Sequence, residues 1–515
     1  MRQFIFSPMT WALLAFSLLP QVNFVHGFVV CPGSQSRISS LKIKIDDRGS
    51  LSLRRLETDI RSKKQNSIEN KEGDTSASVW LTTLVVPLLF VYISNQWSRS
   101  SIYYLVNFSA DADPFRAMNV DIGFSEAQYG LLASVAFTTL FAIASLGAGL
   151  AADRYNRKLL TIVSAVGWSV ATLGEAISSS YSEVVLWRIA MGLSCAFSTP
   201  TAYTLISQNV PKDRISLATS IYGTGVAFGG AFAALSILLD SQVGWKNTMA
   251  TISVFGVASA SLAGLLLPDD PKVQNKQLPA SAEITESDIS PFLDDVTEAV
   301  STTRVKWVFL GSFLRFCSGL CIGVWSAPYF RLVFPDNASD YAVAQAFITA
   351  VAGSTSGLLG GAAADWISSK AEIDPIGQKM WVPVVGSVLA APAWYLAIHS
   401  DQSFQTAMAW LAVEYLVAEC WFGPTISTLQ TTVGKRIGGT AQGLFTMTGA
   451  LANLAPTVLG FLAGKAAGVE ASSELVDLLA AGVCFGYLSS AVCFALSIRT
   501  PPLSATEETA LLKNQ

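Results

Sequence analysis

Twelve long apolar runs divide this chain of 515 residues, and a polar segment separates the first six from the last six. A membrane-spanning helix needs about 20 consecutive, mostly apolar residues. The sequence therefore predicts an all-α membrane protein with twelve transmembrane helices. The runs cover residues 79–104, 125–151, 158–178, 183–208, 215–239, 246–267, 305–330, 341–364, 379–399, 404–429, 438–464 and 473–497.

The composition agrees with a chain that faces lipid. Hydrophobic residues make up 51% and charged residues only 14%, whereas a soluble domain carries about 25% charged residues. The formal net charge of −4 gives no support for a nucleic-acid partner. With only His26 and His399, and seven cysteines without a CxxC pair, the chain lacks the usual residues of a catalytic triad or zinc site. We expect no enzyme, no metal and no cofactor.

The N-terminal segment has the features of a targeting sequence. Residues 1–27 combine a basic start with about ten apolar residues, which is typical of a signal peptide. Residues 28–78 are Ser-rich and at first basic. Together they resemble the two-part presequence of algae with complex plastids, in which the signal peptide ends just before a Phe, here Phe28. This predicts a plastid membrane; the alternative is a disordered tail behind an uncleaved patch, in an endomembrane protein.

The two sets of runs repeat one another. The segment Gly149–Lys158 follows the second run, and the similar segment Gly361–Trp366 follows the eighth, with Asp365 placed 212 residues after Asp153. Two equivalent six-helix bundles around a central site are a common plan of secondary transporters. The expected segments are a first bundle over 79–267, an acidic linker over 268–304, a second bundle over 305–498 and a polar tail over 499–515.

Basic residues predict the orientation of the bundles. Arg154, Arg157 and Lys158 lie in the loop between the second and third runs, and the segment before the first run is also basic. Loops rich in Lys and Arg stay on the cytosolic side of a membrane. We therefore expect this loop and both termini on the cytosolic or stromal side.

The same loop resembles the signature of the major facilitator superfamily, G-x-x-x-D-R-x-x-R-K. The resemblance implies two six-helix bundles and a gating role for Gly149, Asp153, Arg154, Arg157 and Lys158, with Asp365 as the counterpart in the second half. A carboxylate at a helix end can bind basic residues or a helix N-terminus of the other bundle, and such a contact must break when the protein opens. The alternative is a positive-inside anchor without a gating role.

Five further segments carry a second resemblance: Asn95–Arg99, Tyr129–Ser134, Trp168–Ser169, Arg188 with Gly192, and Trp325–Pro328. They resemble the spinster branch of that superfamily, which implies a lysolipid or sphingoid lipid substrate. The branch has acidic residues at two positions where this chain has Ser98 and Cys195, so proton coupling in the family manner is not implied.

Charged residues within the runs mark candidate binding sites, because a charge in a membrane span usually faces a cavity or a partner. Arg99 lies ~30 Å along the first run and Arg188 ~8 Å along the opposed fourth run, so both fall in the outer half of the membrane. Two guanidinium groups there suit a phosphate or carboxylate. The alternative for each is that it reaches to the membrane interface. With Arg315, Asn95 and Trp325 they form the predicted substrate-binding set.

A second set of charges lies in the second half. Arg315 and Glu414 both fall ~15 Å into their runs, and Glu419 lies on a different face from Glu414. One glutamate is expected to neutralise Arg315, and the other is a candidate proton site if burial disfavours its charged form. The alternative is a purely structural ion pair. Glu175, near the outer end of the third run, is a further ion-pair candidate or a simple edge residue.

These observations favour a transporter that moves a small or amphipathic organic anion by alternating access. The lead hypothesis is a lysolipid or sphingoid lipid substrate, and the alternative is a plastid-envelope carrier of organic phosphates or carboxylates. A lipid path predicts an apolar opening between spans. A further alternative is a non-transporting receptor or sensor. The expected partners are the substrate, the bilayer and H⁺ as coupling ion, and we expect a monomer.

Overall fold

The computed structural model describes residues 79–211, 214–269, 296–433, 438–463 and 470–500, which are helical with short connections and contain no strand. The chain divides into two compact units, Met1–Trp80 and Leu81–Gln515, and every helix discussed below belongs to the second. The predicted targeting segment, most of the linker and the polar tail lie outside the described residues.

In the first half the helices follow the predicted runs closely. Short loops and helix breaks separate them, and the longest loop connects η2 to α4. The elements are η1 (Leu81–Val85), α3 (Val86–Ser100), η2 (Ser101–Tyr103), α4 (Met118–Ile122), α5 (Glu126–Gly130), η3 (Leu131–Ala136), α6 (Phe137–Arg154), α7 (Arg157–Ile177), α8 (Tyr181–Cys195), α9 (Ser198–Asn209), α10 (Ile215–Gly223) and α11 (Gly225–Leu266).

The second half repeats this plan with its own breaks. Its elements are α13 (Thr303–Val333), η4 (Pro335–Asn337), α14 (Ala338–Phe347), η5 (Ile348–Gly353), α15 (Ser354–Lys370), α16 (Pro375–Gln378), α17 (Trp381–Ile398), α18 (Phe404–Ala418), η6 (Glu419–Trp421), α19 (Phe422–Val433), α20 (Gly438–Ala452), α21 (Leu454–Ala463) and α22 (Glu470–Arg499).

Nine helical segments of the described chain are long and apolar enough to cross a membrane, against twelve predicted runs. Two of the runs are joined in one stretch, Leu217–Leu266, which bends at Gly244, where φ is 82° and ψ is 162°. The runs 79–104 and 404–429 are helical but do not count among the nine. Both carry charged and polar side chains, which lower their mean hydropathy.

Glycines in the first part of α11 bring this helix close to α3. A Cβ at Gly229 would lie 2.4 Å from the Cβ of Gln96, and one at Gly225 would lie 2.8 Å from the Tyr92 ring. Small residues let two helix backbones approach closely in a membrane. Gly223, by contrast, has open space around it. The close approach packs α3, which carries Asn95 and Arg99, directly against α11.

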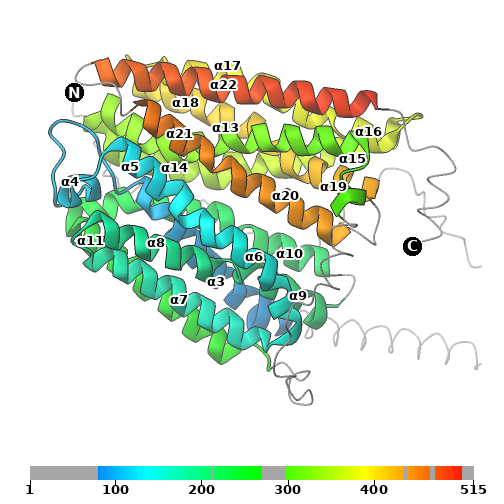
Figure 1. Cartoon of the computed structure of the whole chain (residues 1–515), viewed down its shortest axis with the longest axis horizontal. Coiled ribbons are helices and arrows are strands. Elements are labelled where there is room, and N and C mark those ends of the chain that lie inside the picture. The colour runs from blue at the N-terminus through cyan, green and yellow to red at the C-terminus, as the bar shows by residue number, and fades with distance from the viewer. Residues whose placement is uncertain (1–78, 212–213, 270–295, 434–437, 464–469, 501–515) are drawn as a thin grey trace, which may run out of the picture. The chain divides into compact units, whose positions relative to one another are not determined.

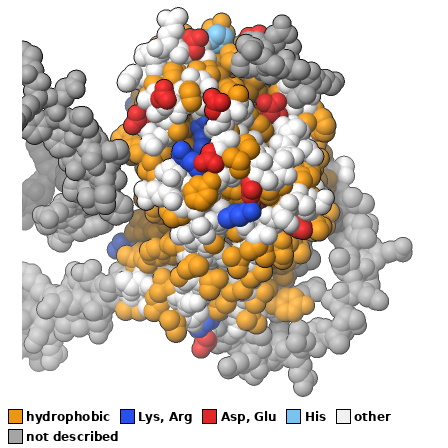
Figure 2. Space-filling model, turned by 90° about the vertical axis from the view of Figure 1, so that its left-hand side faces the viewer, with side chains coloured by type: hydrophobic (Ala, Val, Ile, Leu, Met, Phe, Trp, Pro, Cys, Tyr) orange, Lys and Arg blue, Asp and Glu red, His pale blue; other side chains and the backbone are white. Residues whose placement is uncertain are grey.

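The helices end at two opposite faces of the molecule (Figure 1). We call the end that carries residues 101–123 the loop end; it includes α4 and α5 on the left of Figure 1. We call the opposite end, where α6 meets α7, the Arg157 end. Figure 2 looks onto the loop end and shows acidic and basic side chains next to one another near the middle of that face.

Candidate functional site

A buried ion pair lies in the first half, where α7 turns into α8. The Arg188 and Glu175 side chains are both 0% exposed, and Arg188 Nη1 lies 3.7 Å from Glu175 Oε1. Arg188 Nη2 donates a hydrogen bond to the backbone oxygen of Arg99, at 3.0 Å. The turn between α7 and α8 is short, so the last turn of one helix lies beside the second turn of the next. Arg188 is therefore held from two sides.

Arg99, in the last turn of α3, has a different environment. Its guanidinium carbon lies 4.9 Å from the centre of the Phe137 ring, and that of Arg188 lies 5.8 Å from the same ring. Arg99 is half-buried, and none of the ion pairs found among the described residues includes it. A cation over an aromatic face gains modest attraction but no neutralising charge. Arg99 thus presents an uncompensated positive charge between α3 and α6.

Two buried polar groups on α3 accompany Arg99. Asn95 is 4% exposed and Ser98 0% exposed, and neither the Asn95 Nδ2 nor the Ser98 Oγ has a hydrogen-bond partner. Asn95 lies one turn before Arg99, so the two side chains share a face of the helix. Buried polar groups are nearly always hydrogen-bonded. An orphaned amide donor beside an uncompensated guanidinium is therefore suited to an anionic ligand.

The second half holds a cluster of opposite character around Arg315 of α13. Arg315 Nη2 donates to the backbone oxygen of Ala418 at 2.8 Å and to Glu419 Oε1 at 3.2 Å. Its guanidinium carbon lies 4.7 Å from the Tyr487 ring centre and 5.4 Å from that of Trp421. Of the two glutamates expected near Arg315, Glu419 is the one at ion-pair distance.

Glu414 and Glu419 lie on different faces, as their spacing predicts. Glu414 is buried and accepts a hydrogen bond from the Tyr487 hydroxyl. The Glu419 side chain is 42% exposed, although its partner Arg315 is only 2% exposed. Helix α18 ends at Ala418, and the tight turn η6 (Glu419–Trp421) redirects the chain before α19. This break turns Glu419 away from the packed face that holds Glu414.

The predicted gating residues lie at the Arg157 end. Nothing is described of the side chains at Gly149, Asp153 and Arg154, whose backbone belongs to α6. Arg157 Nη1 donates to Gln208 Oε1 at 2.9 Å, and Lys158 Nζ lies 2.9 Å from Asp269 Oδ1.

In the second half, Asp365 pairs with Lys379 at 3.0 Å. This contact and that of Arg157 each lie within one half. The contact of Lys158 joins the first half to the start of the linker.

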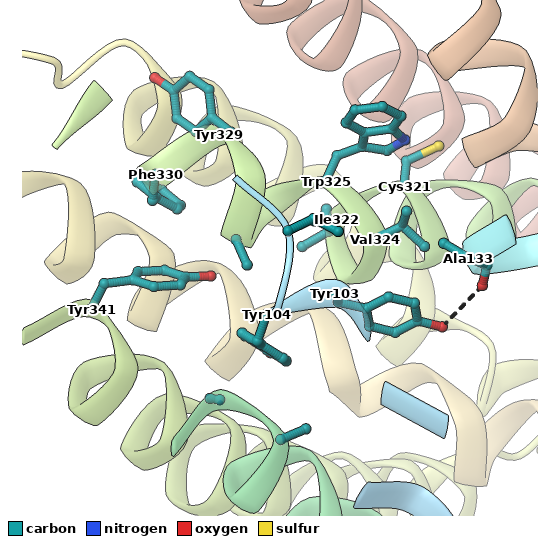
Figure 3. Close-up of a cluster of buried hydrophobic side chains, with 14 of the residues drawn as sticks. Tyr103, Tyr104, Ala133, Cys321, Ile322, Val324, Trp325, Tyr329, Phe330 and Tyr341 are labelled. Atoms are coloured by element: carbon teal, nitrogen blue, oxygen red, sulfur yellow. Dashed lines mark hydrogen bonds between the residues drawn. The ribbon is translucent and has the colours of Figure 1, made fainter. Parts of the chain in front are cut away.

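Trp325 does not accompany the arginines but lies in a cluster at the loop end (Figure 3). Its side chain is fully buried, and its Nε1 donates to the backbone oxygen of Pro456 at 3.1 Å. The Tyr129 ring of the first half meets it edge-on at 5.1 Å, and the Tyr129 hydroxyl donates to the Val324 oxygen at 2.6 Å. Pro328, three residues after Trp325, lies inside α13, which continues to Val333.

Several charged residues at the loop end were not singled out from the sequence. Arg331 and Asp240 lie at the ends of apolar runs, where a charge is ordinary, and Arg116 lies in the loop. In the structure the three side chains meet. Tyr487, which contacts both Arg315 and Glu414, was also missed. The described part of the chain holds no group of three or more His, Cys, Asp or Glu side chains placed to bind a metal ion.

Comparisons with known proteins agree with this architecture. The family model described as the Major Facilitator Superfamily matches residues 77–456. The "Gallate transporter" of Pseudomonas putida is 30% identical over 163 residues. This aligned segment makes up 31% of this chain and about a third (36%) of that protein. The "Probable sulfoacetate transporter SauU" of Cupriavidus necator is 23% identical, over 69% of this chain and 83% of that one. The "Probable galactarate/D-glucarate transporter GudP" of Escherichia coli is 24% identical, over 83% and 95% respectively.

Among solved structures, the chain is similar to a bacterial homolog of the human lysosomal transporter spinster in its inward-facing, unoccupied conformation. The TM-score is 0.62 and the identity 19%, over 84% of this chain and 97% of that one. This likeness concerns the fold. The family match covers well over half of the described helices. The chain therefore belongs to the Major Facilitator Superfamily, and it is a multi-pass membrane protein whose fold resembles that of the spinster branch.

Proposed function

We propose that this protein is a secondary transporter of small organic anions that works by alternating access of its two halves. The observation that carries the proposal is Arg99, a half-buried arginine in a membrane helix that has no carboxylate partner among the described residues. An uncompensated charge is unfavourable in a membrane. It is retained where a ligand of opposite sign supplies the missing charge.

The surroundings of Arg99 define how an anion would bind. A substrate carboxylate accepts hydrogen bonds from the Arg99 guanidinium and from the orphaned Asn95 amide. Arg188, whose guanidinium lies 5.8 Å from the same Phe137 ring, adds positive potential while Glu175 and the Arg99 carbonyl hold it in place. A forked guanidinium suits the two oxygens of a carboxylate, sulfonate or phosphate.

The three relatives compared above support an organic anion as the substrate. Gallate, sulfoacetate, galactarate and glucarate, after which these transporters are named, each carry a carboxylate or sulfonate. They differ in ring, chain length and hydroxyl groups. We therefore propose the anionic group as the common determinant.

The second-half cluster is proposed as the coupling site. The sequence divides the partner of Arg315 and the proton site between two glutamates, whereas we propose that Glu419 has both roles, because its side chain is the exposed one. Glu419 combines an exposed carboxylate with a direct bond to buried Arg315. Protonation of Glu419 releases Arg315, and release changes the contact of α13 with η6. H⁺ is therefore the proposed coupling ion. Glu419 would bind it in place of the acidic residues that this chain lacks at Ser98 and Cys195.

Uptake into proteoliposomes tests the proposal. Purified full-length protein is reconstituted, and uptake of labelled gallate, glucarate and sulfoacetate is compared for Arg99→Gln, Arg99→Lys and a control, Arg499→Gln, which removes an exposed charge at the end of α22. We expect Arg99→Gln to lower uptake at least 10-fold, Arg99→Lys to retain part of it and the control to match the wild type. Wild-type uptake by inserted Arg99→Gln protein would refute the proposed role of Arg99.

A groove between the halves favours a second candidate, a lysolipid or sphingoid lipid. It has a volume of about 180 Å³ and lies between α6 with η3 and α20 with α21. Val135, Leu451 and Leu454 contribute apolar walls, and Thr138 and Asn453 contribute polar ones. An apolar opening between spans is what a lipid path requires. Labelled lysophosphatidylcholine, added as a fourth substrate in the same assay, separates this candidate from the soluble anions.

The remaining alternatives have their own tests. A receptor or sensor would bind one of these anions with no net uptake in any arm of the assay. The plastid location, whether for this transporter or for an organic phosphate carrier, depends on residues 1–78, which lie outside the described residues. A reporter fused to residues 1–78 should enter plastids of an alga with complex plastids. Secretion of the reporter would contradict that location.

A further inference from the structure

We propose that Arg331 is a latch that closes the loop end, and that Asp240 is shared between this latch and Arg116 so that its charge stays compensated when the end opens. The proposal rests on the alternating access proposed above. It names the contacts that must break in that movement.

Arg331 belongs to the second half but binds the backbone of the first. It lies in the last turn of α13, and its side chain is 4% exposed. Its Nη1 donates to the backbone oxygen of Tyr104 at 2.7 Å and to that of Val106 at 3.3 Å. Hydrogen bonds from a charged donor are stronger than neutral ones. These bonds exist only while the two halves meet at this end.

The accepting loop is held in shape by its own bonds. The backbone nitrogen of Asn107 donates to Asn119 Oδ1, and Asn119 Nδ2 donates back to the Asn107 oxygen, both at 2.8 Å. The backbone nitrogen of Met118 donates to the Leu105 oxygen at 2.8 Å. Tyr103 and Tyr104 are buried beside α13, as Figure 3 shows. The carbonyls that Arg331 binds are therefore fixed before it arrives.

Asp240 is the shared counter-ion. Its side chain, on α11, is 0% exposed, and neither of its oxygens makes a hydrogen bond. Arg116 Nε lies 3.6 Å from Asp240 Oδ1, and Arg331 Nη1 lies 3.8 Å from Asp240 Oδ2. Arg116 and Asp240 belong to the first half, so they stay together when the halves separate. An unpaired buried carboxylate would be strongly unfavourable, and Arg116 prevents this in the open state.

Water can reach the separated charges. A pocket of about 370 Å³ opens beside the latch, with walls from both halves that include Asn107, Arg116, Arg331 and Pro335. Arg116 is already 35% exposed. The freed Arg331 can therefore be hydrated as soon as it leaves the carbonyls, which lets the latch open without stranding a charge in an apolar site.

The two ends differ in the way a latch requires. At the loop end, Arg331 and the Tyr129 hydroxyl bond across the halves. At the Arg157 end, the ion pairs Lys158–Asp269, Arg304–Asp374 and Lys379–Asp365 do not cross from one half to the other. The described cross-half bonds thus favour a state that is closed at the loop end.

The experiment measures opening at the loop end directly. Spin labels are placed at Val120 and Ser339, exposed positions on α4 and α14, and their distance distribution is measured by double electron–electron resonance in nanodiscs without substrate. Each label is attached to a cysteine introduced at that position. The protein without the two introduced cysteines is labelled in parallel to report any reaction of the native cysteines. The variants are Arg331→Gln, Arg331→Lys and Arg116→Gln. Lys246→Gln serves as a control, since it breaks the ion pair with Asp121, which lies within the first half.

The glutamine variants of the two arginines, Arg331→Gln and Arg116→Gln, are expected to act in opposite directions. Arg331→Gln removes the guanidinium bonds to the Tyr104 and Val106 oxygens but leaves the Tyr129 bond in place. It should raise the fraction of long distances about 10-fold or more, with Arg331→Lys in between. Arg116→Gln leaves Asp240 dependent on Arg331 and should lower that fraction below the wild-type value. Lys246→Gln should leave the distribution unchanged. Equal distributions for Arg331→Gln and wild type, or a shift in the same direction for both arginine variants, would overturn the proposal.

A second variant covers a failure of Arg331→Gln to fold. Asp240→Asn keeps the carbonyl bonds of Arg331 and removes only the shared charge, so a smaller opening is expected, and no opening would contradict the role of Asp240. None of these measurements needs a substrate. An unchanged distance distribution together with Arg99-dependent uptake would refute the latch alone, whereas absent uptake with the expected distances would refute only the proposed anion transport.

Discussion

The charged clusters in the two halves have opposite compositions. The first half combines two arginines, Arg99 and Arg188, with one carboxylate, Glu175, which is fully buried. The second half combines one arginine, Arg315, with two carboxylates, and one of these, Glu419, is 42% exposed. With every group ionised, the first cluster has an excess positive charge and the second an excess negative charge.

This difference agrees with the different partners proposed for the two halves. An excess cation suits an anionic substrate, and an excess carboxylate suits a proton or another cation. A bound anion would neutralise the excess positive charge of the first cluster. A bound proton would neutralise the excess negative charge of the second. Such an arrangement favours joint movement of anion and proton.

The largest effect is expected from breaking the fully buried ion pair of the first half, Arg188 with Glu175. Arg188→Met leaves the Glu175 carboxylate buried without a partner, and the loss of one member of a buried ion pair costs about 3–5 kcal/mol. We expect a markedly lower thermal unfolding temperature in detergent. Adding Glu175→Gln removes the unpaired charge and should restore much of the loss. Equal stability of Arg188→Met and wild type would show that Glu175 does not depend on Arg188 to compensate its charge.

The next largest effect is expected at the partly exposed ion pair of the second half, Arg315 with Glu419. Glu419→Gln removes the titratable group but keeps an acceptor for Arg315, so we expect uptake driven by a pH gradient to fall roughly 10-fold or more, as is common when a positioned acid or base is removed. Counterflow exchange of anion, which needs no net proton movement, should persist. Loss of both activities together would indicate a structural role for Glu419 and would remove the contrast between the clusters.

A smaller effect is expected from making the first cluster resemble the second. Ser98→Asp places a carboxylate one residue from Arg99, at the position where the spinster branch has its acid. The new charge should neutralise Arg99 and weaken anion binding about 10-fold, equivalent to roughly 1.4 kcal/mol. The measurement is the KM for uptake, with Ser101→Asn, one turn away on the same segment, as the matched control. An unchanged KM would argue against Arg99 as the anion site.

The smallest effect is expected at Glu414. Its contact is a hydrogen bond from Tyr487, and Glu414→Gln retains an oxygen that can accept it. We expect a stability change of about 1 kcal/mol and no change in pH-driven uptake, in contrast to Glu419→Gln. Loss of proton coupling in this variant would move the coupling site from the exposed to the buried carboxylate.

The sequence predicts much of the site because its signals are local. Charges within apolar runs identified Arg99, Arg188, Arg315 and both glutamates of the tenth run, since a charge in a membrane helix is rare and needs a reason. The five-residue spacing of Glu414 and Glu419 also indicated their different faces, to which the structure adds a helix break at η6 that the sequence did not predict. Helix periodicity and hydropathy are enough for such conclusions.

The contacts of the loop end could not be predicted in this way. Arg331 and Asp240 lie near the ends of apolar runs, where charges are ordinary, and the oxygens that Arg331 binds belong to the backbone and have no sequence signature. The same limit applies to Trp325, which the spinster resemblance placed in the binding set and which packs at the loop end instead.

By itself, the sequence determined that this chain crosses a membrane as two repeated sets of helices and that arginines and glutamates lie within them, because apolar length and charge are properties of each segment. Only the tertiary structure decided which charge is compensated and which is not. Glu175 neutralises Arg188 and Glu419 neutralises Arg315, while Arg99 has Phe137 beside it. Neutralisation depends on distances of a few ångströms between side chains on different helices, and these distances are set by how the helices pack.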